Sequence, residues 1–346
     1  MSMPDLKKDW RAPDNWIKIK AIDAHTAGEP LRVVTSGFPE LPGKTILDKR
    51  RYAKENYDHL RKALMWEPRG HADMYGCIIT PPVEDDSDFG VLFTHNEGFS
   101  TMCGHGIIGV TKVVLETGMM AMDEPQTTIK IDTPAGLVAA YAGIKNGKIE
   151  SVFFHNVPSY VDSLANKIDL PDLGTIEYDL AFGGAYYAFV DADKLGLAMT
   201  EENVGNLISA GMDIKRAIME SRSIIHPFDE DMGFLYGTIF TGKALGKADS
   251  RNVCIFAEGE VDRSPTGTGV SARAALHYAK GELKLNEEMV IESIIGTRFS
   301  VKAVKLTKFA SYEAVIPEVK GMAYITGKNE LLIDPEDPLQ SGFVLR

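Results

Sequence analysis

The sequence contains few cysteines, only three in 346 residues. Cys77, Cys103 and Cys254 are too scattered for a disulfide framework or a paired-cysteine metal site, and their odd number suits a reducing compartment. The sequence also lacks an apolar run near the ~20 residues that span a bilayer, and residues 1–16 lack the apolar segment of a signal peptide. We therefore expect a cytoplasmic protein with at least one reactive cysteine.

Dense runs of lysine and arginine are absent as well. The chain has 37 basic and 49 acidic residues, a net charge of −12, which argues against nucleic acid or an anionic membrane as the partner. A small-molecule partner remains. The 44% hydrophobic and 25% charged residues are ordinary for a globular protein, and the length exceeds the ~100–200 residues usual for one domain. We expect two domains.

Short strands outnumber helices in the sequence pattern. Helical periodicity is clearest at residues 49–65, 104–117, 201–221 and 267–280. Strand-like runs, separated by turn residues, are 17–21, 31–35, 76–80, 90–93, 128–131, 137–142, 151–154, 186–190, 237–240, 252–256, 289–291, 300–304 and 314–316. This pattern predicts an α+β fold.

An internal repeat relates the two halves of the chain. An offset of 163 residues carries Cys103 onto Thr266. The same offset pairs Gly104 with Gly267, Gly106 with Gly269 and Gly118 with Gly281. Because a strand, a Gly-x-Gly segment and a closing glycine keep their spacing together, we interpret the repeat as a duplication.

Residues 104–117 are apolar nearly all round, so this helix should be buried. Several short strands around one buried helix predict two pseudo-symmetric lobes, each a curled mixed β-sheet around a central helix, with the two helix N-termini facing a cleft. We expect an N-terminal lobe at 1–178 that carries Cys103 and a C-terminal lobe at 179–346 that carries Thr266. The final strand could pack back on the first lobe.

The two helix N-termini present free N–H groups and the positive ends of helix dipoles, which suit a carboxylate ligand. Cys103 directly precedes Gly104 and feels the same field, which should lower the pKa of its thiol and make it a candidate base. Two structural alternatives stay open. Gly-x-Gly can simply let a strand turn into a helix, and a cysteine can be buried and inert, which fits Cys77 and Cys254.

The segments 102–106 (MCGHG) and 262–269 (DRSPTGTG) resemble the two signature motifs of the proline racemase family. Further matching segments are 23–30, 67–76, 95–98, 182–184, 337–338 and 342–343. The resemblance covers nearly the whole chain and implies the fold of diaminopimelate epimerase, with the active site between two lobes. It also adds a homodimer as an expectation.

One departure from the family pattern decides the expected activity. The racemases and 4-hydroxyproline epimerases of this family carry a cysteine in both motifs, whereas the second position here is Thr266. Inverting a stereocentre needs a base on one face and an acid on the other, and a threonine hydroxyl does not ionise near neutral pH. The Cys/Thr pair resembles the trans-3-hydroxy-L-proline dehydratase branch. It implies a cofactor-independent hydro-lyase, without a metal, in which Cys103 removes the α-proton and Δ1-pyrroline-2-carboxylate forms.

The resemblance also implies binding residues. The substrate carboxylate is expected on the backbone N–H groups of Gly104, His105, Gly267 and Thr268. Asp262 is the expected partner of the ring ammonium, although it could instead cap the following turn. His105 could orient the substrate, tune the thiol or be purely structural. Tyr75 and Phe256 are candidates for the pocket wall, although aromatic residues more often belong to the core.

Three other functions stay open at this point. The first is a proline racemase or hydroxyproline 2-epimerase that uses Cys103 with water or Thr266. The second is a cysteine hydrolase in which His105 or His95 activates Cys103, but this leaves two symmetric helix N-termini unexplained. The third is a non-catalytic anion-binding protein that uses the same glycine loops.

Overall fold

The structure, a computed structural model, describes residues 10–345. Their helices are α1 (Ile46–Asn56), α2 (Asp58–Met65), α3 (Gly104–Glu116), α4 (Val204–Ser221) and α5 (Gly267–Ala279), with short 3-10 helices η1 (Glu201–Asn203) and η2 (Glu230–Met232). Their strands are β1 (Ile17–Thr26), β2 (Glu29–Ser36), β3 (Tyr75–Thr80), β4 (Phe89–His95), β5 (Phe99–Ser100), β6 (Gln126–Thr133), β7 (Gly136–Lys145), β8 (Lys148–His155), β9 (Ser159–Leu170), β10 (Gly174–Phe182), β11 (Tyr186–Asp191), β12 (Leu235–Gly242), β13 (Ser250–Phe256), β14 (Glu260–Val261), β15 (Met289–Glu292), β16 (Arg298–Phe309), β17 (Tyr312–Gly321) and β18 (Ala323–Ile333). The predicted α+β class is confirmed.

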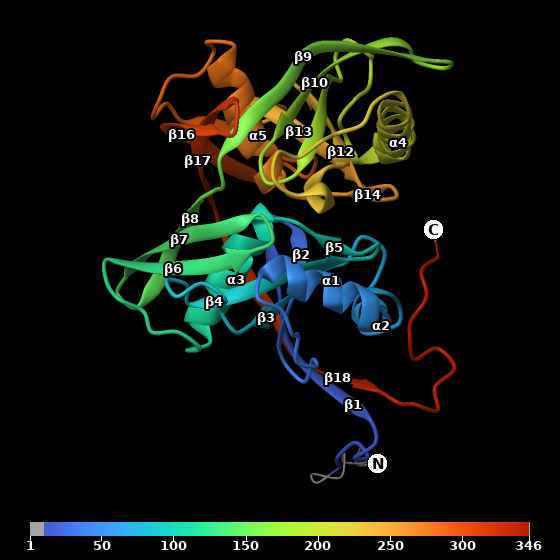
Figure 1. The fold of residues 1–346 in the computed structure, drawn as a ribbon, viewed down its shortest axis with the longest axis vertical. Helices are drawn as coiled ribbons and strands as arrows, with labels where there is room; N and C mark the ends of the chain where they lie inside the picture. The colour runs from blue at the N-terminus through green and yellow to red at the C-terminus, as the bar shows by residue number, and fades with distance from the viewer. Residues whose placement is uncertain (1–9, 346) are drawn as a thin grey trace, which may run out of the picture.

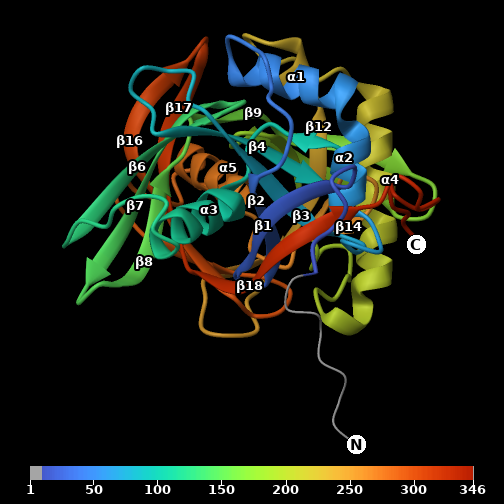
Figure 2. The same ribbon diagram turned by 90° about the horizontal axis from the view of Figure 1, so that it is seen from below.

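Helices α3 and α5 each pack against a curved run of paired strands. Around α5, eight strands pair in a closed ring in the order β9–β10–β11–β12–β13–β15–β16–β17 and back to β9. Beside α3, nine strands pair in the order β18–β1–β2–β3–β4–β6–β7–β8–β17. Strand β17 belongs to both runs, and Figures 1 and 2 show strands on several sides of each helix.

The last strand of the chain lies beside the first. Strand β18 pairs antiparallel with β1, so that Ile333 lies opposite Ile17 and Ala323 opposite Thr26. In Figure 1 the red β18 therefore runs down from the upper group of elements to the blue β1 in the lower group. This pairing ties the end of the sequence to the strands around α3.

Helix α3 is buried along almost its whole length, as its apolar sequence predicts. Every residue from Gly104 to Leu115 is buried, and the one charged side chain among them, Lys112, reaches Glu116 at 2.8 Å. Burial of this kind removes apolar surface from water at ~25 cal/mol per Å². The helix is therefore a fixed central element on which the surrounding strands, and the residues at its N-terminus, are positioned.

The sequence pattern misplaces some elements. The predicted helix at 49–65 is two helices, because the chain leaves helical geometry at Tyr57, where φ is −129°. A capping box between Thr45 and Asp48 starts α1 three residues before the predicted start. Strands β9, β10 and β18 are not predicted, since polar residues interrupt their apolar pattern.

The N-termini of α3 and α5 meet through two glycines. A Cβ atom built on Gly104 would lie 2.5 Å from the Cα atom of Gly267, and one built on Gly267 would lie 2.5 Å from the Cα atom of Gly104. Side chains at these positions would keep the helices apart. The residues that precede them, Cys103 and Thr266, are the N-caps of the two helices, so the fold brings the repeat-related positions together.

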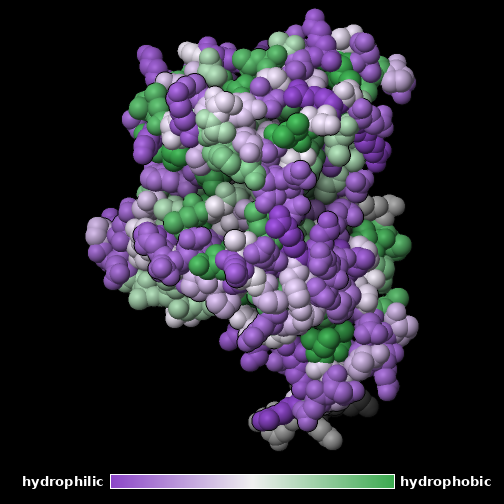
Figure 3. Space-filling model, viewed as in Figure 1, coloured by the Kyte–Doolittle hydropathy of each residue, from purple (hydrophilic) through white to green (hydrophobic). Residues whose placement is uncertain are grey.

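The surface shown in Figure 3 is mainly hydrophilic, with apolar residues in small scattered groups. No helix within residues 10–345 is both long and apolar enough to cross a membrane.

Candidate active site

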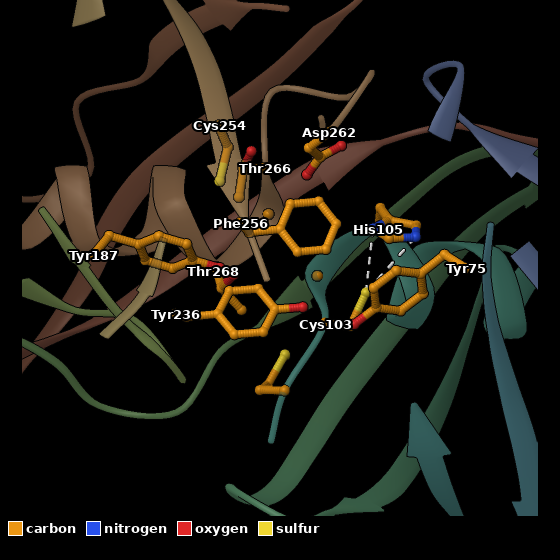
Figure 4. A pocket seen from close by; sticks show the side chains of 13 residues that line it. Tyr75, Cys103, His105, Tyr187, Tyr236, Cys254, Phe256, Asp262, Thr266 and Thr268 are labelled. Carbon is orange, nitrogen blue, oxygen red and sulfur yellow. Dashed lines mark hydrogen bonds between the residues drawn. The ribbon is translucent and has the colours of Figure 1, made fainter. Parts of the chain in front are cut away.

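A pocket lies where the N-termini of α3 and α5 meet (Figure 4). The space within it that is free of atoms, open solvent included, is about 290 Å³. Its lining comprises Tyr75, Met102, Cys103, Gly104, His105, Tyr187, Tyr236, Cys254, Phe256, Asp262, Thr266, Gly267 and Thr268. The structure thus brings together, in one pocket, all nine residues that the sequence indicates.

Cys103 lies at the N-terminus of α3 with its side chain turned onto the first turn of the helix. Its backbone is extended, with φ −148° and ψ 109°, and its Sγ accepts a hydrogen bond from the N–H of Gly106 at 3.2 Å. Nδ1 of His105 is 3.2 Å from the same sulfur. Because only 4% of Cys103 is exposed, the thiol is held in a fixed place where a ligand in the pocket can reach it.

The pKa of the Cys103 thiol differs from the sequence expectation. Burial raises this pKa well above its ordinary value, and the negative charges of Asp262 and Glu29 raise it further. Hydrogen bonds from Gly106 and Tyr75 lower the pKa but do not outweigh burial. The predicted lowering of this pKa is therefore wrong. The N–H of Gly106 at the start of α3 favours the thiolate, but the loss of solvation in this closed pocket is the larger effect.

His105 is neutral in this pocket, because burial lowers its pKa to about 3. Its ring meets that of Tyr75 edge-on, with centroids 4.7 Å apart. A neutral imidazole can share a hydrogen bond with the thiol but brings no positive charge to it. His95, the other histidine that could activate the thiol, instead places Nδ1 3.3 Å from Oε1 of Glu260.

Thr266 occupies the position equivalent to Cys103 but has a different backbone. Its φ of 68° and ψ of 93° lie in a region that β-branched residues rarely adopt. The side chain makes no capping hydrogen bond to α5, and Oγ1 is buried without a hydrogen-bond partner of normal geometry. Figure 4 shows this hydroxyl near the carboxyl of Asp262 and the thiol of Cys254. Backbone strain of this kind is concentrated at functional sites.

Asp262 is a buried carboxyl group at the edge of the pocket. One of its oxygens accepts the N–H of Ser264 at 2.7 Å, and burial raises its pKa to about 6. The group is therefore mostly ionised at neutral pH. Glu29 lies behind it and accepts the N–H of Arg263 at 2.7 Å. Burial, and next the charge of Asp262, raise the pKa of Glu29 well above its ordinary value.

The sequence did not identify four of the pocket residues, namely Met102, Tyr187, Tyr236 and Cys254. The hydroxyl of Tyr187 forms a 2.7 Å hydrogen bond with that of Thr268. Cys254 is buried as expected, but it also lines the pocket. Met102 adjoins Cys103 and could have been identified from the motif. The tyrosines gave no such signal, because aromatic residues in apolar strands usually belong to the core.

The first turns of α3 and α5 supply the polar backbone of the pocket. The first N–H groups of a helix have no partner within the helix, and here they belong to glycines and their neighbours at two helix N-termini that touch. Such an arrangement favours a carboxylate. No group of three or more His, Cys, Asp or Glu side chains arranged to hold a metal ion occurs within the described part of the chain.

Comparisons with known proteins all indicate the same family. The sequence model described as "Proline racemase" matches residues 21–344. A protein of Colwellia psychrerythraea named trans-3-hydroxy-L-proline dehydratase is 49% identical, over 96% of this chain and 94% of its own length. A Clostridioides difficile protein named proline racemase is 43% identical, over 95% of this chain and 98% of its own.

A solved structure shows the same fold. The crystal structure of a hydroxyproline epimerase from Agrobacterium vitis, with bound trans-4-hydroxy-L-proline, superposes with a TM-score of 0.90 at 34% identity, covering 95% of this chain and 96% of that one. Sequence and fold therefore agree over nearly the whole chain, which belongs to the proline racemase family.

Proposed function

We propose that the protein is a trans-3-hydroxy-L-proline dehydratase that forms Δ1-pyrroline-2-carboxylate, with Cys103 as the base. The observation that carries this proposal is the pair of Cys103 and Thr266 at two touching helix N-termini, one group able to ionise and the other not. Relatives that carry this name, at 43–49% identity, support the proposal.

Two features of the pocket would orient the substrate. The carboxylate binds the N–H groups at the start of α3 and α5, among them those of His105 and Thr268, which also stabilise the negative charge that develops as the α-proton leaves. The ring ammonium binds the ionised carboxylate of Asp262 as a charge-assisted hydrogen bond. These two contacts leave the α-carbon between Cys103 and Thr266.

Substrate binding would remove one of the smaller causes of the raised pKa of the thiol. The ammonium neutralises the charge of Asp262, which is one of the causes that raise the pKa of Cys103. Loss of that charge favours the thiolate at the moment when it is needed. In a trans-3-hydroxyproline the α-hydrogen and the 3-hydroxyl lie on the same ring face, so the elimination proceeds on the side of Cys103 alone.

A proline racemase or hydroxyproline 2-epimerase is the main alternative. Family members with these names are 43% and 34% identical to the chain. Both activities need a second group that exchanges a proton on the opposite face. The hydroxyl of Thr266 does not ionise near neutral pH, which favours the dehydratase.

The hydrolase alternative gains one observation, the 3.2 Å contact between Cys103 and His105. It leaves the second helix N-terminus and the buried Asp262 without a role, and the relatives that support the dehydratase do not support it. We therefore do not favour it.

We also propose the two-lobe arrangement, with the boundary before β9 instead of between residues 178 and 179 as the sequence suggests. The two strand runs around α3 and α5, which share only β17, support two lobes. Strand β9 and the start of β10 pair into the ring around α5, which favours a division somewhat before residue 178.

The proposed function is tested by incubating the purified protein separately with trans-3-hydroxy-L-proline, trans-4-hydroxy-L-proline and L-proline. We expect a pyrroline product from the first compound and unchanged optical purity of the other two. Inversion of L-proline or trans-4-hydroxy-L-proline without any pyrroline product would favour the racemase or epimerase.

A further inference from the structure

Three buried hydroxyl groups form a hydrogen-bonded chain beside Cys103. Oη of Tyr75 is 2.5 Å from Oγ of Ser100, and Oγ of Ser100 is 2.8 Å from Oη of Tyr236. No more than 7% of any of these residues is exposed. Both tyrosines line the pocket, and Figure 4 shows the phenol oxygen of Tyr236 directed toward Cys103 and Tyr75. We call these residues the hydroxyl chain.

The rings that carry the hydroxyl chain are held firmly. Tyr75 stacks on His95 with centroids 5.8 Å apart, and Tyr236 meets the same ring edge-on at 6.1 Å. Tyr236 also stacks on Phe256 at 5.3 Å. Strands β3 and β5 supply Tyr75 and Ser100, whereas β12 supplies Tyr236. The hydroxyl chain thus joins residues far apart in sequence and fixes both phenols at the pocket.

One proton of the hydroxyl chain is not used in the hydrogen bonds within it and can be donated to another group. Three hydroxyls carry three protons, and the two hydrogen bonds between them use two. The third proton lies on Tyr75 facing Cys103, on Tyr236 facing the pocket, or on Ser100 when both phenols donate to it. The relay uses the first two arrangements. Burial keeps both phenols protonated, since it raises the pKa of Tyr75 and of Tyr236 well above the ordinary value. The hydroxyl chain can therefore pass a proton along, because each hydroxyl gives up one proton as it accepts another and none becomes charged.

We propose that Tyr75, Ser100 and Tyr236 relay the proton that Cys103 removes to the departing 3-hydroxyl group, so that Tyr236 is the immediate acid. This inference rests on the proposed dehydratase function and supplies the acid that the elimination needs. In the proposed binding mode both the α-hydrogen and the hydroxyl depart on the side of Cys103, which is the side where the hydroxyl chain lies.

The relay balances protons and electrons. The Cα–H bond breaks, its proton moves to Sγ of Cys103, and its electron pair forms the Cα=Cβ double bond as the C3–O bond breaks. Tyr236 donates its proton to the departing oxygen, Ser100 donates to Tyr236, Tyr75 donates to Ser100, and the Cys103 thiol donates to Tyr75. Water and an enamine leave, and the thiolate is restored with the Tyr75 hydroxyl now directed toward it. Rotation of the three hydroxyls resets the chain.

The relay is tested with Tyr236→Phe and Ser100→Ala, each of which removes one oxygen atom from the hydroxyl chain. Two substrates are compared, trans-3-hydroxy-L-proline and trans-3-fluoro-L-proline, because fluoride can leave without accepting a proton. We expect kcat/KM for loss of water to fall by about 10²–10⁴, the usual contribution of a general acid. Fluoride release should change much less, so that the ratio of the two rates shifts at least ~30-fold.

The matched control is Tyr160→Phe. Tyr160 and Tyr186 form another buried pair of hydroxyls, 2.6 Å apart, outside the pocket lining. This variant should leave the ratio unchanged. If Tyr236→Phe and Ser100→Ala fold normally by circular dichroism but slow both substrates equally, or neither, the relay is overturned. Failure of the native enzyme to dehydrate trans-3-hydroxy-L-proline would instead reject the proposed function.

Discussion

The Cα atom of Gly267 lies where a side chain on Gly104 would have to be, 2.5 Å from the Cβ position of Gly104. Through this contact the N-termini of α3 and α5 approach closely enough for one small carboxylate to reach the N–H groups of both. The geometry of the pocket therefore depends on the absence of two side chains as much as on the presence of Cys103 and Thr266.

Gly104→Ala should disrupt this contact. The added methyl group meets backbone atoms of Gly267, which cannot move aside without separating the helices, so we expect a loss of about 1–3 kcal/mol in unfolding free energy and loss of most activity. Gly205→Ala in α4 is the control, because nothing lies within 4 Å of its Cβ position. It should stabilise the protein slightly. Equal thermal unfolding of native protein and Gly104→Ala would contradict this account.

Cys103→Ser should reduce turnover by about 10²–10⁴, because an alcohol is a far weaker base than a thiolate at neutral pH. The fold should survive the change. Iodoacetamide should inactivate the native enzyme by labelling Cys103, and pyrrole-2-carboxylate should protect it. Mass spectrometry identifies the labelled residue. Inactivation that follows labelling of only Cys77 or Cys254 would count against Cys103 as the base.

Asp262→Asn should make the protein more stable and less active. The native carboxyl has a pKa of about 6 against an ordinary 3.8, so the folded state binds the proton more tightly. The contribution of Asp262 to stability is therefore greatest below about pH 4 and falls as pH rises through 6, by about 2–3 kcal/mol. The asparagine of the variant does not ionise, so the variant does not lose this stability and should unfold at a higher temperature than the native protein at pH 7.5.

The same variant changes the pH profile of the reaction. In the native enzyme kcat/KM should rise with pH through about 6, as Asp262 ionises to receive the substrate ammonium. Asp262→Asn should lose this limb and about 1.5–3 kcal/mol of transition-state stabilisation. An unchanged kcat/KM would mean that Asp262 only shapes the loop before α5.

Thr266→Cys should introduce two-sided proton transfer. In the proposed binding mode, a thiol at this position would face the α-carbon opposite Cys103 and could exchange its proton near neutral pH. We expect slow racemisation of L-proline by the variant and little or none by the native enzyme, measured by chiral chromatography. Racemisation of L-proline by the native enzyme at a comparable rate would show that Thr266 is not what prevents inversion.

The site is more predictable than the fold around it. The offset of 163 residues is enough to pair Cys103 with Thr266, because glycines that must pack against backbone keep their spacing in both halves of the repeat. Strands β9, β10 and β18 escape prediction, since their alternation of exposed and buried residues is set by the closed ring and by pairing with β1. Such long-range pairing leaves little trace in local sequence.

The pKa of Cys103 and the position of Tyr236 could not be predicted for a related reason. A motif reveals the field of a helix N-terminus, but the burial that outweighs it comes from residues distant in sequence. Likewise Tyr236 resembles an ordinary core residue in an apolar strand until Ser100 and Tyr75 are placed beside it. These features depend on how the strands surround the pocket, so only the structure reveals them.

The central claim is one-sided elimination by Cys103, and one measurement tests it most directly. Trans-3-hydroxy-L-proline is incubated with the native enzyme in D₂O and followed by ¹H NMR, which resolves the pyrroline product, the remaining substrate and its 2-epimer. The account predicts loss of substrate to Δ1-pyrroline-2-carboxylate without any 2-epimer. Accumulation of the 2-epimer, deuterated at the α-carbon, with no pyrroline product would contradict it.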